Sequence, residues 1–386
     1  MKRIHLITTI LSAILLIGCH NGPDITSIGV DDNYSVPRLQ KLSLATGAAG
    51  DSFKWEIISE SGEVTLLSED RECIFVAEKS GNYSLILTIT DNGEEIIKTS
   101  AIVVLPEEVE YKAKMSKVLE FNPAPGQFIN DLPEYEAGDT KESTRKKTEQ
   151  YLLNVNGSMV SLGSFGGYIV VGFDHTIINR KGEKDFFLGS NAFTGSSECG
   201  IVSVSLDRNN NGIADDEWYE IAGSEYNNPE TIKNYQVTYY RPEEGKTPIP
   251  GGSGVVDKEY IKWSDNIGGE GFIEQNNFTN HSLEYWPQWS NAKELTFTST
   301  LLPENYTIKS NGQYFLDKYA WGYADNYPNR DKENNSFDIS WAVNSNGEKV
   351  ELIGIDFIKV ATGLLQNCGQ IGESSTEFIG AEDLNL

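Results

Sequence analysis

The sequence predicts an all-β protein with a small N-terminal sandwich and a larger β-rich domain. Two observations support this fold class. Short segments that alternate apolar and polar residues recur about every ten residues, as in sandwich strands. The 386-residue chain also contains 36 glycines, which suit many turns. A single stretch, Thr140 to Leu153, is rich in Lys, Glu, Arg and Gln and predicts either a short helix or a solvated loop.

The first 19 residues have the pattern of a secretory signal. Lys2 and Arg3 precede an apolar run from Ile7 to Ile17 that is too short to span a bilayer. The run ends in Leu16-Ile17-Gly18-Cys19, which resembles the lipobox of bacterial lipoproteins. We therefore expect Cys19 to carry lipid and to anchor the chain to a membrane. Residues 20–35 lack periodicity and predict a flexible tether.

Residues 36–106 predict the small sandwich. Phe53–Ile58 and Tyr83–Thr90 alternate in polarity, and Asn92-Gly93 predicts a tight hairpin turn before Ile96–Val104. The Trp55 strand and the run from Gly81 to Asp91 resemble those of a PKD-like, immunoglobulin-type module. Such modules commonly act as spacers.

Residues 111–386 predict a larger, jelly-roll-like β-sandwich with long loops. Ile355–Val360 is almost wholly apolar, as strands at the centre of a buried sheet are. The other predicted strands are two joined through glycine within Val160–Phe173, the pair Val202–Leu206 and Trp218–Ala222, and Asp338–Val343 followed, after a turn at Asn346-Gly347, by Val350–Ile353.

An acidic loop, Asp207 to Asp216, matches the spacing of calcium-binding loops, D-x-[DN]-x-[DN]-G-x-x-D. Oxygen ligands would come from the side chains of Asp207, Asn209, Asn211 and Asp215 and from the carbonyl of Ile213. Position twelve is Trp218 instead of the glutamate of an EF-hand, so Asp216 is the further candidate ligand. The ion would be structural, and the alternative is an acidic turn without metal.

Aromatic residues concentrate between Tyr260 and Tyr327, in segments that do not alternate like strands. Rings beside Asn, Asp and Gln suit a flat ligand with a polar rim, and the alternative is packing of a satellite core beneath long loops. The candidate ligand-binding residues are Trp263, His281, Tyr285, Trp286, Trp289, Trp321, Tyr323 and Tyr327.

Composition argues against several other functions. The formal charge of −26 disfavours nucleic acid as a partner. The chain has no H-E-x-x-H motif, G-x-S-x-G motif or phosphate loop, so we expect no enzyme activity. The 57 acidic residues nevertheless leave a glycosidase carboxylate pair open. Spacing alone leaves open whether Cys199 and Cys368 pair.

Several stretches of the larger domain resemble a family of cell-surface lipoproteins of gut Bacteroidetes. They are VSLGSFGGYIVVGFDHTIIN (160–179), DFFLGSNAF (185–193), EWYEIAGSEYNNP (217–229) and the stretch from Phe337 to Leu384. The resemblance is to the cobalamin-binding members (BtuH-like). It implies an outer-membrane, surface-exposed lipoprotein that binds cobalamin or a related corrinoid beside a TonB-dependent transporter. The aromatic loops leave a glycan-binding lipoprotein as the alternative, followed by a glycoside hydrolase.

Overall fold

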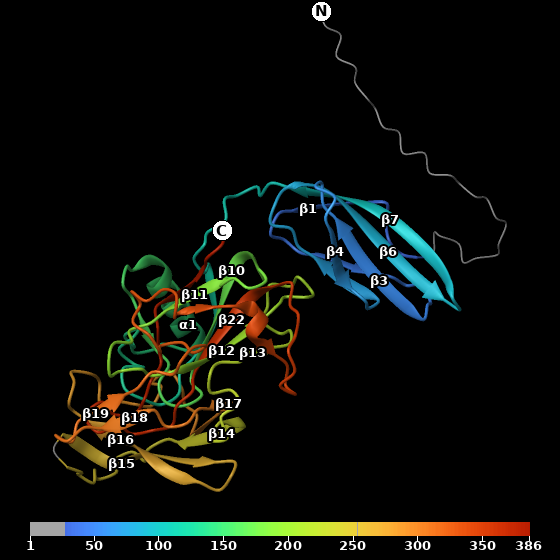
Figure 1. The fold of residues 1–386 in the computed structure, drawn as a ribbon. Coiled ribbons are helices and arrows are strands. Elements are labelled where there is room, and N and C mark those ends of the chain that lie inside the picture. Colours follow the sequence, from blue (N-terminus) through green and yellow to red (C-terminus); the bar gives the residue numbers. More distant parts are fainter. Residues whose placement is uncertain (1–27, 253) are drawn as a thin grey trace, which may run out of the picture.

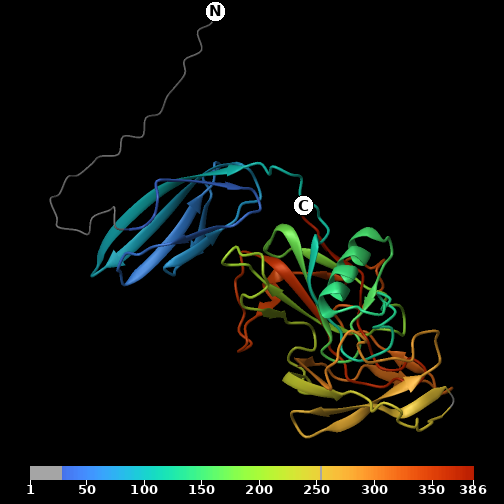
Figure 2. The same cartoon turned by 180° about the vertical axis from the view of Figure 1, so that it is seen from behind.

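The computed structural model describes residues 28–252 and 254–386, which form two β-rich units (Figures 1 and 2). The predicted signal peptide, Cys19 and residues 20–27 of the predicted tether lie outside the described residues. The all-β sandwich class is confirmed, because strands dominate and the described part of the chain contains one α-helix. In that part of the chain, no helix has the length and apolar character needed to cross a bilayer.

The N-terminal sandwich packs a five-stranded sheet against a two-stranded one around Trp55, whose side chain is fully buried. Inward residues alternate along the strands, as in Trp55 and Ile57, because successive side chains point to opposite faces. The sandwich begins before residue 36, since Ile28 and Val30 belong to its core. The predicted tether therefore overlaps the fold. The sheets are β1 (Asn33–Pro37), β7 (Glu94–Leu105), β6 (Gly81–Asp91), β3 (Ser52–Ile58) and β4 (Val64–Ser68), in that order, and β2 (Leu42–Ala45) with β5 (Glu72–Phe75).

The larger unit is organised around a six-stranded sheet. Its strand β22 (Gly354–Thr362) is buried except at Lys359, as the apolar sequence predicts. The other strands of this sheet are β21 (Ala342–Val343), β13 (Tyr219–Ile221), β12 (Gly200–Ser205), β10 (Tyr168–Ile178) and β8 (Lys117–Asn122), in the order β21-β13-β12-β22-β10-β8.

Further sheets surround this one. A four-stranded sheet lies at the end of the larger unit away from the N-terminal sandwich (Figure 1). The additional sheets are β16 (Glu270–Asn276), β15 (Val255–Asp265), β14 (Ile232–Tyr240) and β17 (Glu294–Leu301); β20 (Ser336–Phe337), β11 (Phe186–Gly189) and β24 (Gly380–Asp383); β18 (Tyr306–Ile308) and β19 (Tyr314–Leu316); and β23 (Glu377–Phe378) with β9 (Val160–Ser161).

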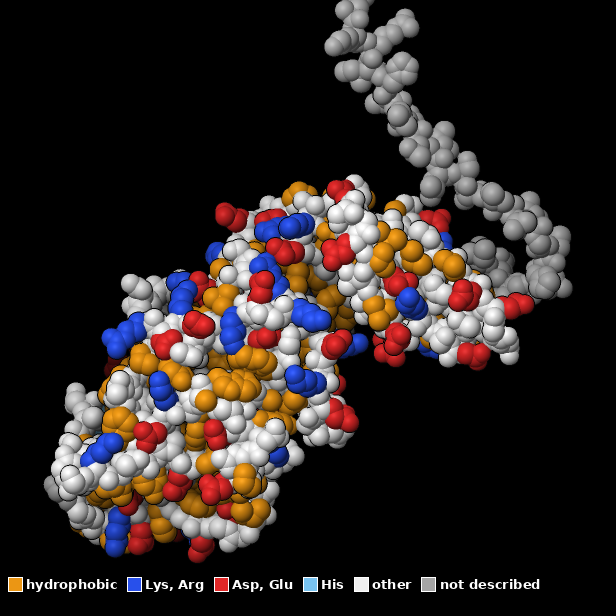
Figure 3. All heavy atoms as spheres, in the orientation of Figure 1, with side chains coloured by type: hydrophobic (Ala, Val, Ile, Leu, Met, Phe, Trp, Pro, Cys, Tyr) orange, Lys and Arg blue, Asp and Glu red, His pale blue; other side chains and the backbone are white. Residues whose placement is uncertain are grey.

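The charged stretch near residue 140 forms helix α1 (Lys141–Asn154), so the helical alternative is correct. Thr140 and Ser143 form a reciprocal cap, in which each side-chain oxygen accepts from the other residue's backbone N–H, at 3.1 and 2.8 Å. Thr144, Thr148 and Leu152 are buried at four-residue spacing and make one face of the helix. Acidic and basic side chains are interspersed over the face of the molecule seen in Figure 3.

Two predicted strands near residue 340 are wrong. Residues Ile339–Trp341 form a short 3-10 helix, because the Asp338 carboxylate accepts a hydrogen bond from the backbone N–H of Ser340 at 2.8 Å and starts a turn. Only Ala342–Val343 remains as strand β21, and Val350–Ile353 is irregular. The three cysteines of the described residues are free and buried, so Cys199 and Cys368 do not pair.

The two units contact each other through a buried ion pair. Lys41 Nζ of the sandwich lies 2.8 Å from Asp356 Oδ1 on β22, and the two side chains are 5% and 11% exposed. Nearby, the backbone N–H of Thr176 donates to the carbonyl of Leu39 at 2.9 Å. At the edge of the contact, Arg180 pairs with Glu78 at 2.8 Å. The sandwich is thus fixed to the central sheet by polar contacts.

Replacing Lys41 with methionine is expected to lower the free energy of unfolding by about 3 kcal/mol, because it leaves Asp356 buried without its counter-ion. The matched control is Lys54→Met in the same sandwich. Lys54 pairs with Glu56 but is half exposed, so its loss should cost less than about 1 kcal/mol. Urea denaturation followed by circular dichroism measures both, and equal effects would contradict a stabilising role for the interface.

Candidate functional site

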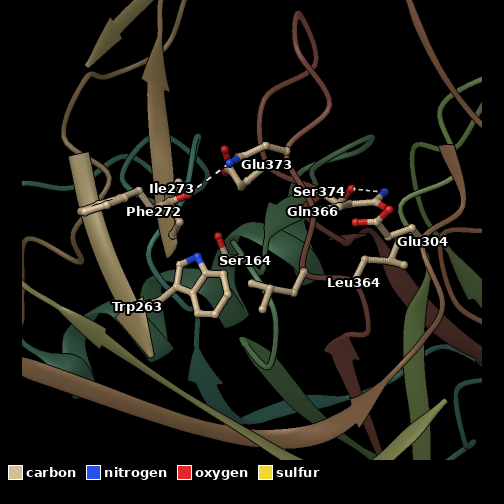
Figure 4. A pocket seen from close by; sticks show the side chains of 11 residues that line it. Ser164, Trp263, Phe272, Ile273, Glu304, Leu364, Gln366, Glu373 and Ser374 are labelled. Atoms are coloured by element: carbon tan, nitrogen blue, oxygen red, sulfur yellow. Dashed lines mark hydrogen bonds between the residues drawn. The ribbon is translucent and has the colours of Figure 1, made fainter. Parts of the chain in front are cut away.

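A cavity of about 160 Å³ lies where three parts of the larger unit meet, and we call it the Trp263 cavity (Figure 4). Strands β15 and β16 supply one wall, the segment after β22 supplies another, and the loop between β17 and β18 supplies Glu304. In Figure 4, Trp263 and Glu304 lie on opposite sides with Ser164 between them. The lining residues are Ser164, Trp263, Phe272, Ile273, Glu304, Leu364, Leu365, Gln366, Asn367, Glu373 and Ser374.

The backbone around Ser164 is fixed by a turn that requires glycine. Gly163 has a φ of +70°, and a Cβ atom there would lie 2.0 Å from the carbonyl oxygen of Ala124. No other residue fits this approach. The turn therefore presses residues 163–167 against the segment that leads to Gln127, and it places Ser164 on the cavity wall.

Two buried polar atoms of the cavity residues have no hydrogen-bond partner within the described part of the chain. They are Ser164 Oγ and Glu373 Oε2. Other polar residues of the lining are satisfied: Gln366 Nε2 donates to Asn305 Oδ1 and to Ser374 Oγ, both at 2.8 Å. Since buried polar groups nearly always have partners, these two atoms are candidates for hydrogen bonds to enclosed water beside the cavity.

Glu373 is held by its neighbours in a buried position. Its Oε1 accepts a hydrogen bond from the backbone N–H of Gln127. Burial raises the pKa of the Glu373 carboxyl to about 7, although that hydrogen bond opposes the shift. Near neutral pH this side chain can therefore either donate or accept a hydrogen bond at the cavity.

Glu373 belongs to a group of four carboxyls, Glu198, Asp325, Glu373 and Glu377, which we call the acid cluster. Glu198 is half-buried and the other three are buried. Glu198 Oε1 accepts from Ser375 N and Asp325 Oδ2 accepts from Glu377 N, both at 3.0 Å. Burial raises the pKa of Asp325 to about 7. Burial, and then repulsion between the carboxylates, raises the pKa of Glu198 and Glu377 well above the ordinary value. Sequence reasoning missed this cluster, although glutamates within Ser-Ser-Glu (196–198) and Glu-Ser-Ser-Thr-Glu (373–377) could have signalled it.

The structure divides the eight predicted aromatic and histidine candidates among several sites. Trp263 alone lines the cavity. Tyr285 and Trp286 are core residues beside it, and His281 Nε2 lies 2.9 Å from Tyr285 Oη. Trp289 packs on the core of the six-stranded sheet. Trp321 packs on Trp341 with ring centroids 4.6 Å apart, and Tyr323 and Tyr327 are buried.

The acidic loop lies between β12 and β13, as its flanking strands predict. Asp207 accepts from the backbone N–H groups of Asn211 and Gly212, at 3.1 and 2.9 Å. Asn211 Nδ2 lies 3.1 Å from the Asp215 carboxylate. Asp216 Oδ2 instead accepts from Arg208 N at 3.2 Å.

The donor set of this loop suits a hard cation only if amides and carbonyls take part. No three His, Cys, Asp or Glu side chains of the described residues are grouped to hold a metal ion. Side-chain oxygens of Asp207, Asn209, Asn211 and Asp215, with the Ile213 carbonyl, are the kinds of ligand that Ca²⁺ takes. Burial, then the neighbouring Asp207 and Asp215, raises the pKa of Asp216.

Comparisons with known proteins add little to this geometry. Neither the protein-family models nor the curated proteins give a match. A solved structure described as a SusE-like protein aligns over 90% of this chain and 94% of its own, with 11% sequence identity and a TM-score of 0.23. A TM-score this low supports no inference about fold or function.

The acid cluster predicts that the free energy of unfolding falls as pH rises from about 5 to 7. The folded-state pKa values of Asp325 and Glu373 are about 7, above those of exposed carboxyls, so the folded protein binds more protons than the unfolded chain. Their contribution is complete below the unfolded pKa of about 4 and is lost between about pH 4 and 7, at about 1.4 kcal/mol per pH unit for each proton. Above about pH 7 both carboxyls are ionised in the folded and the unfolded state, so their part of the slope disappears. Urea denaturation across this range measures the slope.

Glu377→Gln should flatten that slope, because an amide does not ionise. The control is Glu382→Gln, which changes a carboxylate outside the cluster and should leave the slope unchanged. A free energy of unfolding that rises between about pH 5 and 7 would contradict the assignment.

Proposed function

We propose that this protein is a cell-surface lipoprotein that binds a glycan without turning it over. The observation that carries the proposal is the Trp263 cavity, in which an aromatic ring lies near two buried polar atoms that lack partners. Sugars combine an apolar C–H face with hydroxyl groups. The indole of Trp263 can contact that face, while the exposed Glu304 offers acceptors to the hydroxyls and Ser164 and Glu373 can reach them through bridging water.

The size of the cavity favours a single sugar ring over a large planar ligand. Its volume of about 160 Å³ is below the range of about 300–1,000 Å³ usual for sites that enclose drug-sized ligands. One ring of a longer glycan can enter while the rest lies outside. Cobalamin binding, which the family resemblance implies, would need a broad aromatic platform, and the candidate aromatic residues are dispersed and mostly buried. The cobalamin hypothesis therefore rests on the family resemblance alone.

The position of the cavity suits capture from outside the cell. The lipobox pattern predicts an anchor at Cys19, before the N-terminal sandwich. The cavity borders the four-stranded sheet, at the end of the larger unit away from that sandwich (Figure 1). We therefore propose an outer-membrane location with the cavity directed away from the membrane, and transfer of ligand to a TonB-dependent transporter.

Binding of the purified protein to a glycan array tests the proposal, followed by calorimetry with the bound glycan. Trp263→Ala should weaken binding at least about tenfold, because truncating a central aromatic side chain typically costs more than about 1.4 kcal/mol. Trp321→Ala is the matched control, because Trp321 is 39% exposed and does not line the cavity.

Three outcomes would overturn the proposal. Binding of cyanocobalamin without any glycan would favour the corrinoid function. Equal losses in the two tryptophan variants would place the site elsewhere. Release of reducing sugar that Glu373→Gln abolishes would make the protein a glycoside hydrolase.

We further propose that the 207–216 loop holds one structural Ca²⁺. EDTA should then lower the melting temperature by at least about 2 °C, and excess Ca²⁺ should restore it, since a ligand of the folded state stabilises that state. Asp215→Ala should remove the response, whereas Glu230→Ala, outside the loop, should retain it. Asp215 is preferable to Asp207, whose carboxylate also holds two loop N–H groups. An unchanged melting temperature in EDTA would refute the site.

A further inference from the structure

A second cavity, distinct from the Trp263 cavity, has a volume of about 600 Å³. It lies between the C-terminal end of α1, the segment 112–116 that follows the linker from the sandwich, and the sheet edge formed by β11 and β24. Figure 2 shows α1 on the outer side of the larger unit, where this linker arrives. We call it the Lys112 cavity. Its volume is within the range of about 300–1,000 Å³ that small-molecule sites occupy.

The lining of the Lys112 cavity is amphipathic. Met115, Leu152 and Ala381 are buried core residues at its floor, and Phe187 and Ile379 are half-buried beside them. Apolar surface of this kind gains free energy when a ligand displaces water from it. A purely polar solute would gain little from such a lining.

Two lysines give the Lys112 cavity a positive charge. Lys112 and Lys114 both line the cavity and both are exposed. The backbone N–H of Lys112 donates to the Asp174 carboxylate at 3.4 Å, but neither lysine's ammonium group forms an ion pair with a carboxylate of the described residues. The acidic lining residue, Glu382, pairs with Lys332 at 3.2 Å and is thereby neutralised. The two free ammonium groups therefore leave a local positive charge on a protein whose net charge is −26.

The end of α1 favours one orientation of a charged ligand. Residues 152–155 line the cavity at the helix C-terminus, where the last carbonyls carry partial negative charge. An anionic group is disfavoured there and favoured beside the lysines. An apolar body can still lie along Leu152 and Phe187.

We propose that the Lys112 cavity binds a small amphipathic anion, with its acidic head at Lys112 and Lys114 and its apolar body between α1 and the β11–β24 sheet. The proposal is independent of glycan binding, because the two cavities share no lining residue.

The test uses two fluorescent probes of similar shape on the full chain. One is the anion 1-anilinonaphthalene-8-sulfonate, and the other is the uncharged N-phenyl-1-naphthylamine. The anion should bind at a single site, and its dissociation constant should rise with salt, because added ions screen exposed charges. The double variant Lys112→Gln/Lys114→Gln should raise the dissociation constant of the anion at least about threefold, since two exposed charge contacts are lost. It should leave the uncharged probe unchanged.

A cavity-filling variant locates the bound probe. A Cβ atom at Gly380 would meet nothing within 4 Å, and Gly380 lines the cavity. Gly380→Phe should therefore fold and should abolish binding of both probes. The control Lys79→Gln/Lys181→Gln removes two exposed lysines that do not line the cavity and should change neither affinity.

Several results would overturn the proposal. They are no binding of the anion, binding that survives Gly380→Phe, and equal losses in the two lysine double variants. Both lysine variants alter exposed side chains, so thermal melts that match the unmodified protein confirm that they fold.

Discussion

The position of β22 at the centre of the six-stranded sheet is the constraint on which the other features depend. The strand is hydrogen-bonded to β10 on one side and β12 on the other, and almost every side chain on it is buried. Near its start, Asp356 binds Lys41 of the sandwich, Thr176 Oγ1, and the backbone N–H of Asp207 that opens the acidic loop. Beyond its end, the chain lines the Trp263 cavity. One strand therefore positions the sandwich, the acidic loop and the candidate site.

Hydrogen bonds to the backbone explain how this unit tolerates the carboxyls of the acid cluster. The segment that carries Glu373 and Glu377 is otherwise composed of small hydroxyl residues, and Ser375 Oγ pairs with Ser161 Oγ at 2.7 Å. Backbone N–H groups and protons shared near neutral pH offset the cost of burial. Glu373 and Ser374 of this segment also line the Trp263 cavity, so the protonation of Glu373 sets whether that wall donates or accepts a hydrogen bond.

The sequence predicted several strands well, because strand alternation and the Asn92-Gly93 turn are local effects. The start of the sandwich was placed too late, since Ile28 and Val30 already belong to its core. The strand predicted at Asp338–Val343 was wrong, because the Asp338 carboxylate starts a turn in a segment whose apolar residues had suggested a strand. Of the candidate site, only Trp263 was found. Its neighbours Ser164, Glu304 and Glu373 come from distant segments, and tertiary packing alone brings them together. Clustering of aromatic residues along the chain did not distinguish a binding surface from a core.

The buried aromatic residues affect the site indirectly, through hydrogen bonds that lead to Glu373. The Tyr285 carbonyl accepts from Gly126 N at 2.9 Å, and its hydroxyl bonds to Asn276 N at 3.1 Å and to His281 Nε2 at 2.9 Å. Burial lowers the pKa of His281, which keeps the ring neutral near pH 7 and able to form these bonds. These contacts hold residues 126 and 127 in place, and Gln127 N in turn binds Glu373 Oε1. A change at Tyr285 or His281 would therefore displace Glu373. If the proposed glycan binding is tested with such a variant, loss of binding is no evidence that either side chain contacts the glycan.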